Sequence, residues 1–296
     1  MTASLLSRFG TRQAVLAGCL MLVALTVGGC TFTDTIKPQI FWDSLFHPSP
    51  ALINGIGLTL VISVVAQLIG VILGVVAAIA KMAKFYPFRL VANLYVWFFR
   101  GTPLLVQLMF FYYGFPAAGI FKWPAVVAGP LDILPEILAG IVILGINEGA
   151  YMAEIVRAGI LSVDPGQTEA SKSLGMTYGQ TMRRIVLPQA ARVIIPPLGN
   201  EFNNMLKTTS LLVVVSVFEL YNTFSTAAGR TYASFEFLAA CAIWYLLLTT
   251  IWGFVQAWIE RKFAKGTAAA ANNNDYGWRS RLVGLRNNSG RMWGGH

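Results

Sequence analysis

Long runs of apolar residues, bounded by charged or turn-forming positions, recur along the chain. We expect membrane spans near residues 14–32, 56–80, 92–118, 136–157, 194–218 and 237–259, because each run has about the 20 residues that cross a bilayer as a helix. The third run is interrupted by Arg100-Gly101-Thr102-Pro103. Either a helix begins there, with Thr102 as N-cap and Pro103 in its first position, or one kinked helix runs through. The pattern predicts an all-α, polytopic membrane helix bundle of about six transmembrane helices.

Composition supports this fold class. The 296 residues are 56% hydrophobic and only 12% charged, whereas about 25% of the residues in a soluble domain are charged. Six spans with their connections use up the chain, so any energy-coupling domain must lie on another polypeptide. The three cysteines and two histidines have no metal-ligand spacing, so no metal site is predicted. No HExxH, GxSxG or paired intramembrane aspartate favours a membrane-embedded enzyme.

The basic residues predict the orientation of the spans. With the N-terminus inside, 18 of the 22 lysines and arginines, Arg100 among them, fall in the predicted cytoplasmic stretches. The predicted outside loops carry acidic residues instead, including Glu219 and Glu236. We therefore expect both termini to be cytoplasmic, and the net charge of +9 needs no nucleic-acid partner.

The first apolar run has two interpretations. Residues 14–30 follow Arg8 and Arg12 and end in Gly28-Gly29-Cys30, which is compatible with a cleaved signal and a lipid-modified cysteine. We expect a retained span, because more membrane helices follow it instead of a soluble domain. The tail after residue 263 is basic and of low complexity, so we expect it to be disordered and to contact anionic membrane lipid.

The connection at residues 159–193 is long and patterned, and it predicts two short helices. Asp164 before Pro165 is an N-cap signal, and Gly175 can end the first helix in a left-handed conformation. Thr177 and Gln180 have the spacing of a capping box, and Pro188 is expected to end the second helix.

An apolar stripe runs along the second loop helix. Tyr178, Met182 and Ile185 share one face, which suits docking onto a cytoplasmic partner. The same stripe would suit a loop that packs back on its own bundle, and periodicity alone does not separate the two interpretations.

Sequence motifs favour the first interpretation, in which the loop docks onto a cytoplasmic partner. Residues 169–175 (EASKSLG), followed by 185–188 (IVLP), resemble the EAA loop of ABC-transporter permeases, with Ser171 in place of the usual second alanine. The resemblance implies a coupling element that inserts into the ATPase subunit. Its residues here are Glu169, Ala170, Gly175, Ile185, Leu187 and Pro188.

Three further motifs narrow the resemblance. Residues 99–107 (FRGTPLLVQ), 147–160 (NEGAYMAEIVRAGI) and 197–211 (PLGNEFNNMLKTTSL) are similar to permeases for polar amino acids of the histidine, glutamine and glutamate uptake type. The similarity covers about residues 51–263 and implies a five-helix importer core, preceded at residues 1–50 by a cytoplasmic stub, an extra span and an outside loop.

The resemblance also implies partners. These are an ABC ATPase dimer, an extracytoplasmic amino-acid-binding protein, and a second permease, either an identical copy or a sister subunit. Residues 166–173 (GQTEASKS) end like a phosphate loop but have Ser171 where the second glycine is required, so we expect no cofactor on this chain and place ATP and Mg on the partner ATPase.

Polar residues inside the predicted spans are candidates for the substrate route, because they are costly in hydrocarbon. They are Asn147, Glu148, Asn200, Glu201, Asn203 and Lys207. The asparagines have an alternative role in joining helices, and a neighbouring carboxylate, Glu154, is better explained by a pair with Arg157 three residues on. Glu201 and Lys207 do not share a helix face, so each needs a partner elsewhere.

We therefore expect the transmembrane permease subunit of an ATP-driven importer for polar amino acids, in the bacterial plasma (inner) membrane. The alternative is an ion-coupled secondary amino acid transporter or channel, which would not require the helix pair in the cytoplasmic loop.

Overall fold

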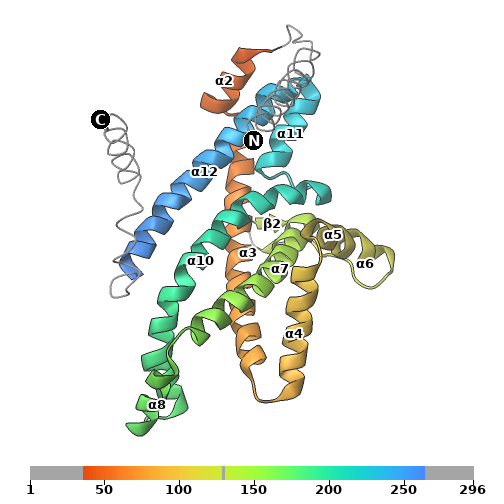
Figure 1. The fold of residues 1–296 in the computed structure, drawn as a ribbon. Coiled ribbons are helices and arrows are strands. Elements are labelled where there is room, and N and C mark those ends of the chain that lie inside the picture. The colour runs from red at the N-terminus through yellow and green to blue at the C-terminus, as the bar shows by residue number, and fades with distance from the viewer. Residues whose placement is uncertain (1–35, 129–130, 264–296) are drawn as a thin grey trace, which may run out of the picture.

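The computed structural model describes residues 36–128 and 131–263 (Figure 1). The predicted span at 14–32 and the basic tail at 264–296 lie outside the described residues. The described part is almost entirely helical, which confirms the all-α membrane bundle.

Three long helices have the length and apolar composition of membrane spans: α3 (Pro50–Met82), α7 (Pro135–Leu161) and α12 (Ser234–Phe263). Two bent pairs pass the same test. In the first, α4 (Tyr86–Gly101) meets the segment Leu104–Ala117 at 105°; in the second, Tyr178–Val215 meets α11 (Leu220–Thr231) at 51°. Within the described residues there are thus three spans, or up to five if each bent pair is one span.

The remaining elements are shorter or interrupted. The segment Leu104–Ala117 comprises α5 (Leu104–Met109), the π-helix η1 (Phe110–Gly114) and α6 (Phe115–Ala117). The others are α2 (Pro38–Phe46), the antiparallel strands β1 (Val126–Ala128) and β2 (Leu131–Ile133), α8 (Pro165–Ser173), α9 (Tyr178–Thr181), the π-helix η2 (Met182–Val186), α10 (Leu187–Thr208) and the 3₁₀ helix η3 (Thr209–Val215).

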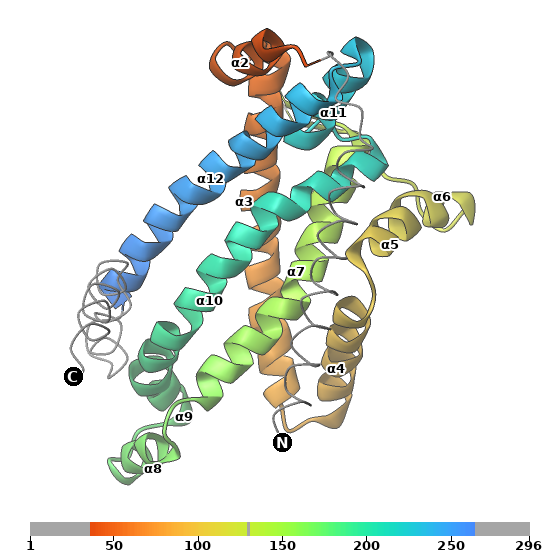
Figure 2. The same cartoon turned by 45° about the horizontal axis from the view of Figure 1, so that its top comes forward.

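The bundle has two distinct ends. In Figure 2, α8 and α9 lie at the same end as the turn between α3 and α4, which carries Lys81 and Lys84; we call this the basic end. Helices α2 and α11 lie at the opposite end, which we call the far end (Figure 2). Helices α7 and α12 run from the far end to the basic end, and α10 runs in the opposite direction.

Glycines let α3 and α7 pack closely. A Cβ added at Gly74 would lie 2.2 Å from the Cβ of Met152, and one at Gly70 would lie 2.6 Å from Cγ of Glu148. On α7, a Cβ at Gly145 or Gly149 would similarly meet α3 side chains at 2.7 and 2.8 Å. Each helix thus presents two glycines four residues apart, the small-residue spacing that brings helix backbones together in a membrane, where lipid provides no hydrophobic driving force between helices.

Hydrogen bonds from uncharged side chains hold the two helices together at the break in the third predicted span. The carbonyl of Phe99, near the end of α4, accepts hydrogen bonds from Nδ2 of Asn147 at 3.0 Å and Nε2 of Gln107 at 2.9 Å. Gln107 also donates to the hydroxyl of Thr102 and accepts from Asn147. The predicted break is present, but Pro103, not Thr102, is the N-cap of α5, because the Thr102 hydroxyl is engaged with α4 and Gln107. The alternative interpretation, in which one kinked helix runs through residues 100–103, is therefore wrong.

The position of Arg100 also requires a correction. It lies in the last turn of α4, 14 residues beyond Tyr86, so a rise of 1.5 Å per residue places it about 21 Å along the helix from the basic end. Arg100 therefore does not belong to the basic connection between α3 and α4 in which the sequence interpretation counted it.

The prediction that Pro188 ends the second loop helix is wrong. The chain stays helical from α9 through η2 into α10, and Pro188 lies in the first turn of α10. In the wider π-turn the N–H of Leu187 bonds the carbonyl of Met182, five residues back, and the turn accommodates a proline ring that has no N–H to donate. The side chain of Gln189 then donates to the carbonyl of Ile185 at 3.1 Å. Helix α10, which contains most of the predicted fifth span, consequently begins seven residues before residue 194.

Glu219 lies inside the bundle at the far end. The sequence analysis expected it in an outside loop, and the structure corrects this expectation. Its side chain is fully buried and caps α11 by accepting from the backbone N–H groups of Tyr221 and Asn222 at 3.0 and 2.8 Å. The hydroxyl of Tyr245 on α12 donates to it at 2.9 Å, and that of Thr59 on α3 at 3.4 Å. One carboxylate therefore joins three helices, and its burial is compensated by these donors.

Glu236 is the second acidic residue that the sequence interpretation placed in an outside loop. Its side chain is buried in the first turn of α12, and its carboxylate accepts from the backbone N–H of Lys37, just before α2. Both acids satisfy helix-end N–H groups, which explains why they are buried at all.

Candidate functional site

A cavity of about 670 Å³ lies between α7, α10, the start of α5 and η3. It is lined by Leu104, Leu144, Asn147, Glu148, Tyr151, Glu201, Asn204, Met205, Lys207, Thr208, Ser210 and Leu211. Apolar walls with a few convergent charged and amide groups are typical of a small-molecule site. We call this hollow the central cavity.

The structure brings four of the six predicted route residues to the central cavity: Asn147, Glu148, Glu201 and Lys207. The other two, Asn200 and Asn203, are not among its lining residues. Oδ1 of Asn200 accepts from Nε2 of Gln256 on α12 at 3.0 Å. Oδ1 of Asn203 is buried without a hydrogen-bond donor among the described residues. Asn200 thus joins two helices, the alternative that the sequence left open, whereas Asn147 lines the cavity and also ties the α4–α5 break.

Glu148 is held against α3. Its side chain is 7% exposed, and its Oε1 accepts a hydrogen bond from Nε2 of Gln67 at 3.2 Å. Gly70, one turn further along α3, leaves the room that the Glu148 side chain occupies. Gln67 is also fully buried, and sequence reasoning did not select it, although a glutamine in an apolar span is a recognisable polar signal.

The charged groups lie in a defined order along the cavity wall. On α10, Lys207 lies six residues nearer the far end than Glu201, a rise of about 9 Å. Among the described residues Lys207 forms no ion pair. The sequence expectation that Glu201 and Lys207 do not pair along their helix thus agrees with the contacts. Carboxyl groups from α7 and α10 and the ammonium group of Lys207 thus line one cavity, and they match the opposite charges of a zwitterion.

The helix pair at the basic end has the predicted caps. The side chain of Asp164 accepts from the N–H of Gly166 at 2.6 Å, and Thr177 and Gln180 form a reciprocal capping box. Gly175 ends α8 with φ of +76°, a left-handed conformation that is strained for residues with a Cβ. The N–H of Met176 bonds the carbonyl of Ser171 at 3.1 Å, the six-to-one bond of a Schellman ending. The two predicted helices and the role of Gly175 in ending the first are confirmed.

In the predicted apolar stripe of Tyr178, Met182 and Ile185, the side chains of Met182 and Ile185 are half-buried. Tyr178 is 69% exposed, but together with Met182 it borders a hollow of about 380 Å³ between α8, η2 and the end of α7. Leu174, which the sequence interpretation did not include, is the most exposed apolar side chain of the pair at 82%. Leu187 is 44% exposed. The helix pair therefore both packs on its own bundle and presents apolar side chains outward.

Ser171 joins the two loop helices. Its side chain is 3% exposed, and its hydroxyl lies 2.9 Å from that of Thr181 on α9 and donates to the carbonyl of Thr168. The serine that departs from the usual alanine of the resembled motif is thus accommodated by a matching hydroxyl. Glu169 and Ala170, on the same helix, are exposed.

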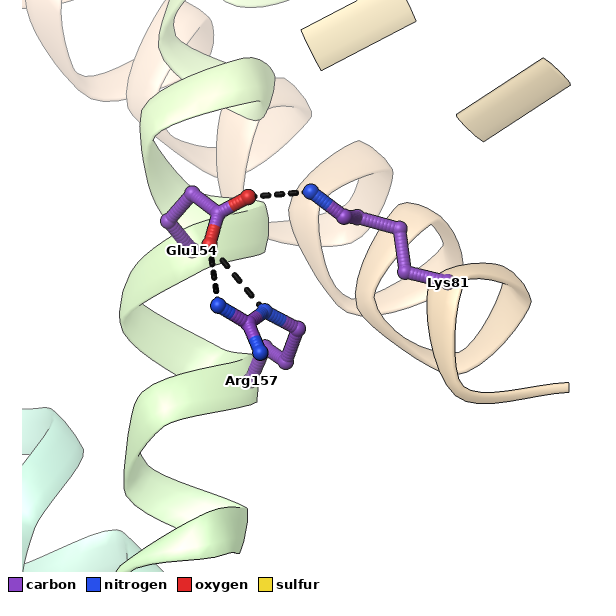
Figure 3. Close-up of polar contacts among 3 residues, drawn as sticks. All are labelled: Lys81, Glu154 and Arg157. Atoms are coloured by element: carbon purple, nitrogen blue, oxygen red, sulfur yellow. Dashed lines mark hydrogen bonds and ion pairs between the residues drawn. The ribbon is translucent and has the colours of Figure 1, made fainter. Parts of the chain in front are cut away.

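Glu154 belongs to an ion cluster outside the cavity lining (Figure 3). One carboxylate oxygen pairs with Nζ of Lys81 at the end of α3, and the other accepts from Nε and Nη2 of Arg157 at 3.1 and 3.0 Å. The expected Glu154–Arg157 pair is confirmed, and Lys81 joins α3 to it.

Comparison with known proteins gives a consistent result. Residues 70–265 match the family described as "Binding-protein-dependent transport system inner membrane component". The arginine transport system permease protein ArgU of Corynebacterium glutamicum is 41% identical over 214 residues, 71% of this chain and 67% of that protein. The L-cystine transport system permease protein TcyB of Bacillus subtilis is 37% identical over 83% of this chain and 97% of its own length. The glutamine transport system permease protein GlnP of Escherichia coli is 34% identical over 76% of this chain and 98% of its own.

Solved structures show the same fold. A crystal structure of an amino acid ABC transporter with histidines superposes with a TM-score of 0.65 at 39% identity, covering 72% of this chain and 94% of that one. An inward-facing structure of the MetNI methionine ABC transporter, at 18% identity, superposes with a TM-score of 0.59 and supports the fold alone.

Proposed function

Since the chain belongs to the family of binding-protein-dependent transport system inner membrane components, and is thus an ABC importer permease subunit and not an enzyme, we propose that it carries a polar amino acid through the central cavity. The observation that supports this substrate class is the convergence of Glu148, Glu201 and Lys207 on that cavity. A zwitterionic amino acid has one ammonium and one carboxylate group, so it finds an opposite charge for each.

The proposed topology places the basic end in the cytoplasm. Lys81, Lys84 and Arg89 lie at the turn between α3 and α4, and the cytoplasmic side of a membrane protein carries the excess of lysine and arginine. The far end would then meet the extracytoplasmic binding protein, and both termini would be cytoplasmic. The five helices of residues 51–263 would form the permease unit, consistent with the family match at 70–265.

The proposed energy source is a separate ATPase dimer that binds ATP and Mg²⁺. Helices α8 and α9 would dock onto it, with Glu169, Ala170, Gly175, Ile185, Leu187 and Pro188 as the coupling residues. Their position at the basic end and the outward apolar side chain of Leu174 support this role. A second permease, identical or a sister subunit, would complete the membrane unit. The secondary-transporter alternative is set aside, because the chain belongs to a binding-protein-dependent family.

Uptake by reconstituted vesicles tests the substrate class. The chain is co-purified with its ATPase and binding protein, and uptake of labelled L-arginine, L-glutamine and L-cystine is measured with ATP and with ADP. We expect ATP-dependent uptake of at least one of them. Uptake that is independent of ATP, or absent for all polar amino acids in a complex that hydrolyses ATP, would contradict the proposal.

Charge-removing variants test the cavity. We expect Glu201→Gln and Glu148→Gln to weaken uptake, because each keeps the size of the side chain and removes an ionisable carboxyl group that lines the cavity. Glu260→Gln is the matched control, because Glu260 lies near the basic end of α12 outside the cavity lining. Normal rate and apparent affinity in both cavity variants would refute the charge-matched route.

A further inference from the structure

Arg100 is a charged side chain within a membrane-spanning element. It lies about 21 Å along α4 from the basic end, where the bent pair α4 and α5–α6 forms one candidate span. Arginine at such a depth is energetically unfavourable, and where it occurs it faces a partner or a water-filled route.

The end of α4 does not need Arg100 as a cap. The carbonyl of Phe99 is already bound by Asn147 and Gln107, and that of Thr102 by Gln107 at 3.1 Å. Among the described residues, none accepts a hydrogen bond or forms an ion pair with Arg100. Its contact is with the face of Tyr151, whose ring centroid lies 5.3 Å from Cζ. A guanidinium stacked on an aromatic ring keeps its N–H donors directed outward in its own plane.

Arg100 is exposed and is not itself a lining residue of the central cavity, but it stacks on Tyr151, whose side chain lines that cavity, so the guanidinium lies at the cavity edge. Tyr151 lies three residues beyond Glu148 on α7, and Lys207 lies toward the far end of the cavity. The cavity thus has Lys207 in its wall and a second cation, Arg100, at its edge beside Tyr151.

We infer that Arg100 binds the α-carboxylate of the transported amino acid at the edge of the cavity beside Tyr151, an inference that rests on the proposed function. Arginine presents paired N–H groups that match both oxygens of a carboxylate. Glu148 and Glu201 then face the substrate ammonium group, and Lys207 is left to interact with the substrate nearer the far end.

Direct binding to the permease–ATPase complex, without the binding protein, tests the inference. The probes are L-arginine and L-glutamine, each compared with its carboxamide, which lacks the negative charge. We expect the wild type to prefer the free acid, and Arg100→Gln to weaken binding of the acid about 10- to 100-fold while leaving the carboxamide nearly unchanged. Arg100→Lys should restore part of the preference, because it keeps the charge and loses the paired geometry.

Arg89→Gln is the matched control, since Arg89 lies on the same helix and stacks 5.5 Å from the centroid of Tyr86, which, unlike Tyr151, does not line the cavity. Binding to the wild type with an unchanged acid preference in Arg100→Gln would overturn the inference and leave the proposed function intact. Loss of the preference in Lys207→Gln alone would assign the carboxylate to Lys207. Absence of binding of any amino acid to the wild type would refute the proposed function itself. Altered association of two permease chains, with unchanged binding, would assign Arg100 to their interface.

Discussion

The same substitution at two glycines of α3 should have opposite effects on stability. At Gly74, a Cβ would lie 2.2 Å from Cβ of Met152 and 2.9 Å from its backbone carbonyl carbon, whereas the space around a Cβ at Gly57 is empty within 4 Å. Carbon atoms in favourable contact are about 3.5–4.0 Å apart, so Gly74→Ala requires α3 and α7 to separate locally by roughly 1.5 Å. The Cβ and carbonyl carbon of Met152 are fixed by the helix backbone, so they cannot move away by side-chain rotation as the end of a long side chain can.

The magnitude follows from two opposing terms. Replacing glycine by alanine inside a helix favours the helix by about 1 kcal/mol, and this gain applies at both positions. Overpacking at Gly74 opposes it by about 1–3 kcal/mol. Since the first term cancels between the two variants, we expect Gly74→Ala to be less stable than Gly57→Ala by about 1–3 kcal/mol.

The assay is the midpoint of thermal unfolding of the purified complex in detergent. At about 2–4 °C per kcal/mol, Gly74→Ala should melt about 2–12 °C below Gly57→Ala. The Gly57 variant should melt at or above the wild type. A midpoint for Gly74→Ala equal to or above that of Gly57→Ala would refute the argument that glycines set the spacing of these two helices.

Three further predictions concern the basic and far ends. Gly175→Asp should abolish uptake while leaving the complex folded, because an aspartate is strained at φ of +76° and unfavourable at a helix carboxyl end by about 0.3–1 kcal/mol; Gly179→Ala, with open space around it, should transport normally. Normal uptake by the Asp variant would remove the coupling role. Glu219→Ala should lower the thermal midpoint, since it leaves buried donors unpaired at about 1–3 kcal/mol each, and an unchanged midpoint would disprove the three-helix junction. Glu154→Gln should lower the thermal midpoint by an amount equivalent to about 1–3 kcal/mol, because its side chain and that of Lys81 are only 22% and 14% exposed and the pair is largely shielded from water; high salt should change the difference little, and an unchanged midpoint would disprove the role of this cluster in holding α3 to α7.

Features with a local cause could be predicted from the sequence. The caps at Asp164 and Thr177 and the left-handed ending at Gly175 depend only on neighbouring residues, and all three are present. The apolar runs predicted the long helices for the same reason. The runs at 56–80, 136–157 and 237–259 correspond to α3, α7 and α12, whereas those at 92–118 and 194–218 fall in the two bent pairs, whose bends of 105° and 51° the apolar runs alone do not show.

Features that depend on distant residues were missed. From the sequence alone, Glu219 is interpreted as an acidic residue of an outside loop. The hydroxyl groups of Thr59 and Tyr245, which donate hydrogen bonds to its buried carboxylate, come from two other helices. Asn203 and Asn200 were grouped with the route residues by polarity, but neither lines the cavity, and Asn200 is bound instead by Gln256 of α12. Which polar residues of α10 reach the cavity depends on the helices packed around it, which the sequence of α10 does not contain.

Some features that we did not predict do have a recognisable pattern in the sequence. Gly70 and Gly74 on α3, and Gly145 and Gly149 on α7, have the four-residue spacing of small residues at a membrane helix contact. A search for that spacing would have paired the two helices. No comparable signal marks Arg100, because its depth in the bundle depends on where α4 begins.

The joint between α4 and α5 is built from uncharged groups: the amides of Asn147 and Gln107, the hydroxyl of Thr102 and backbone carbonyls. Moving one elementary charge across a membrane potential of 100 mV changes the free energy by about 2.3 kcal/mol, whereas rearranging neutral amides moves no net charge. Neither amides nor hydroxyls titrate near neutral pH. Rearranging these hydrogen bonds would therefore not by itself respond to the membrane voltage or to pH, and any voltage dependence of bending at this joint would have to come from displacement of Arg100, the charged residue in the last turn of α4.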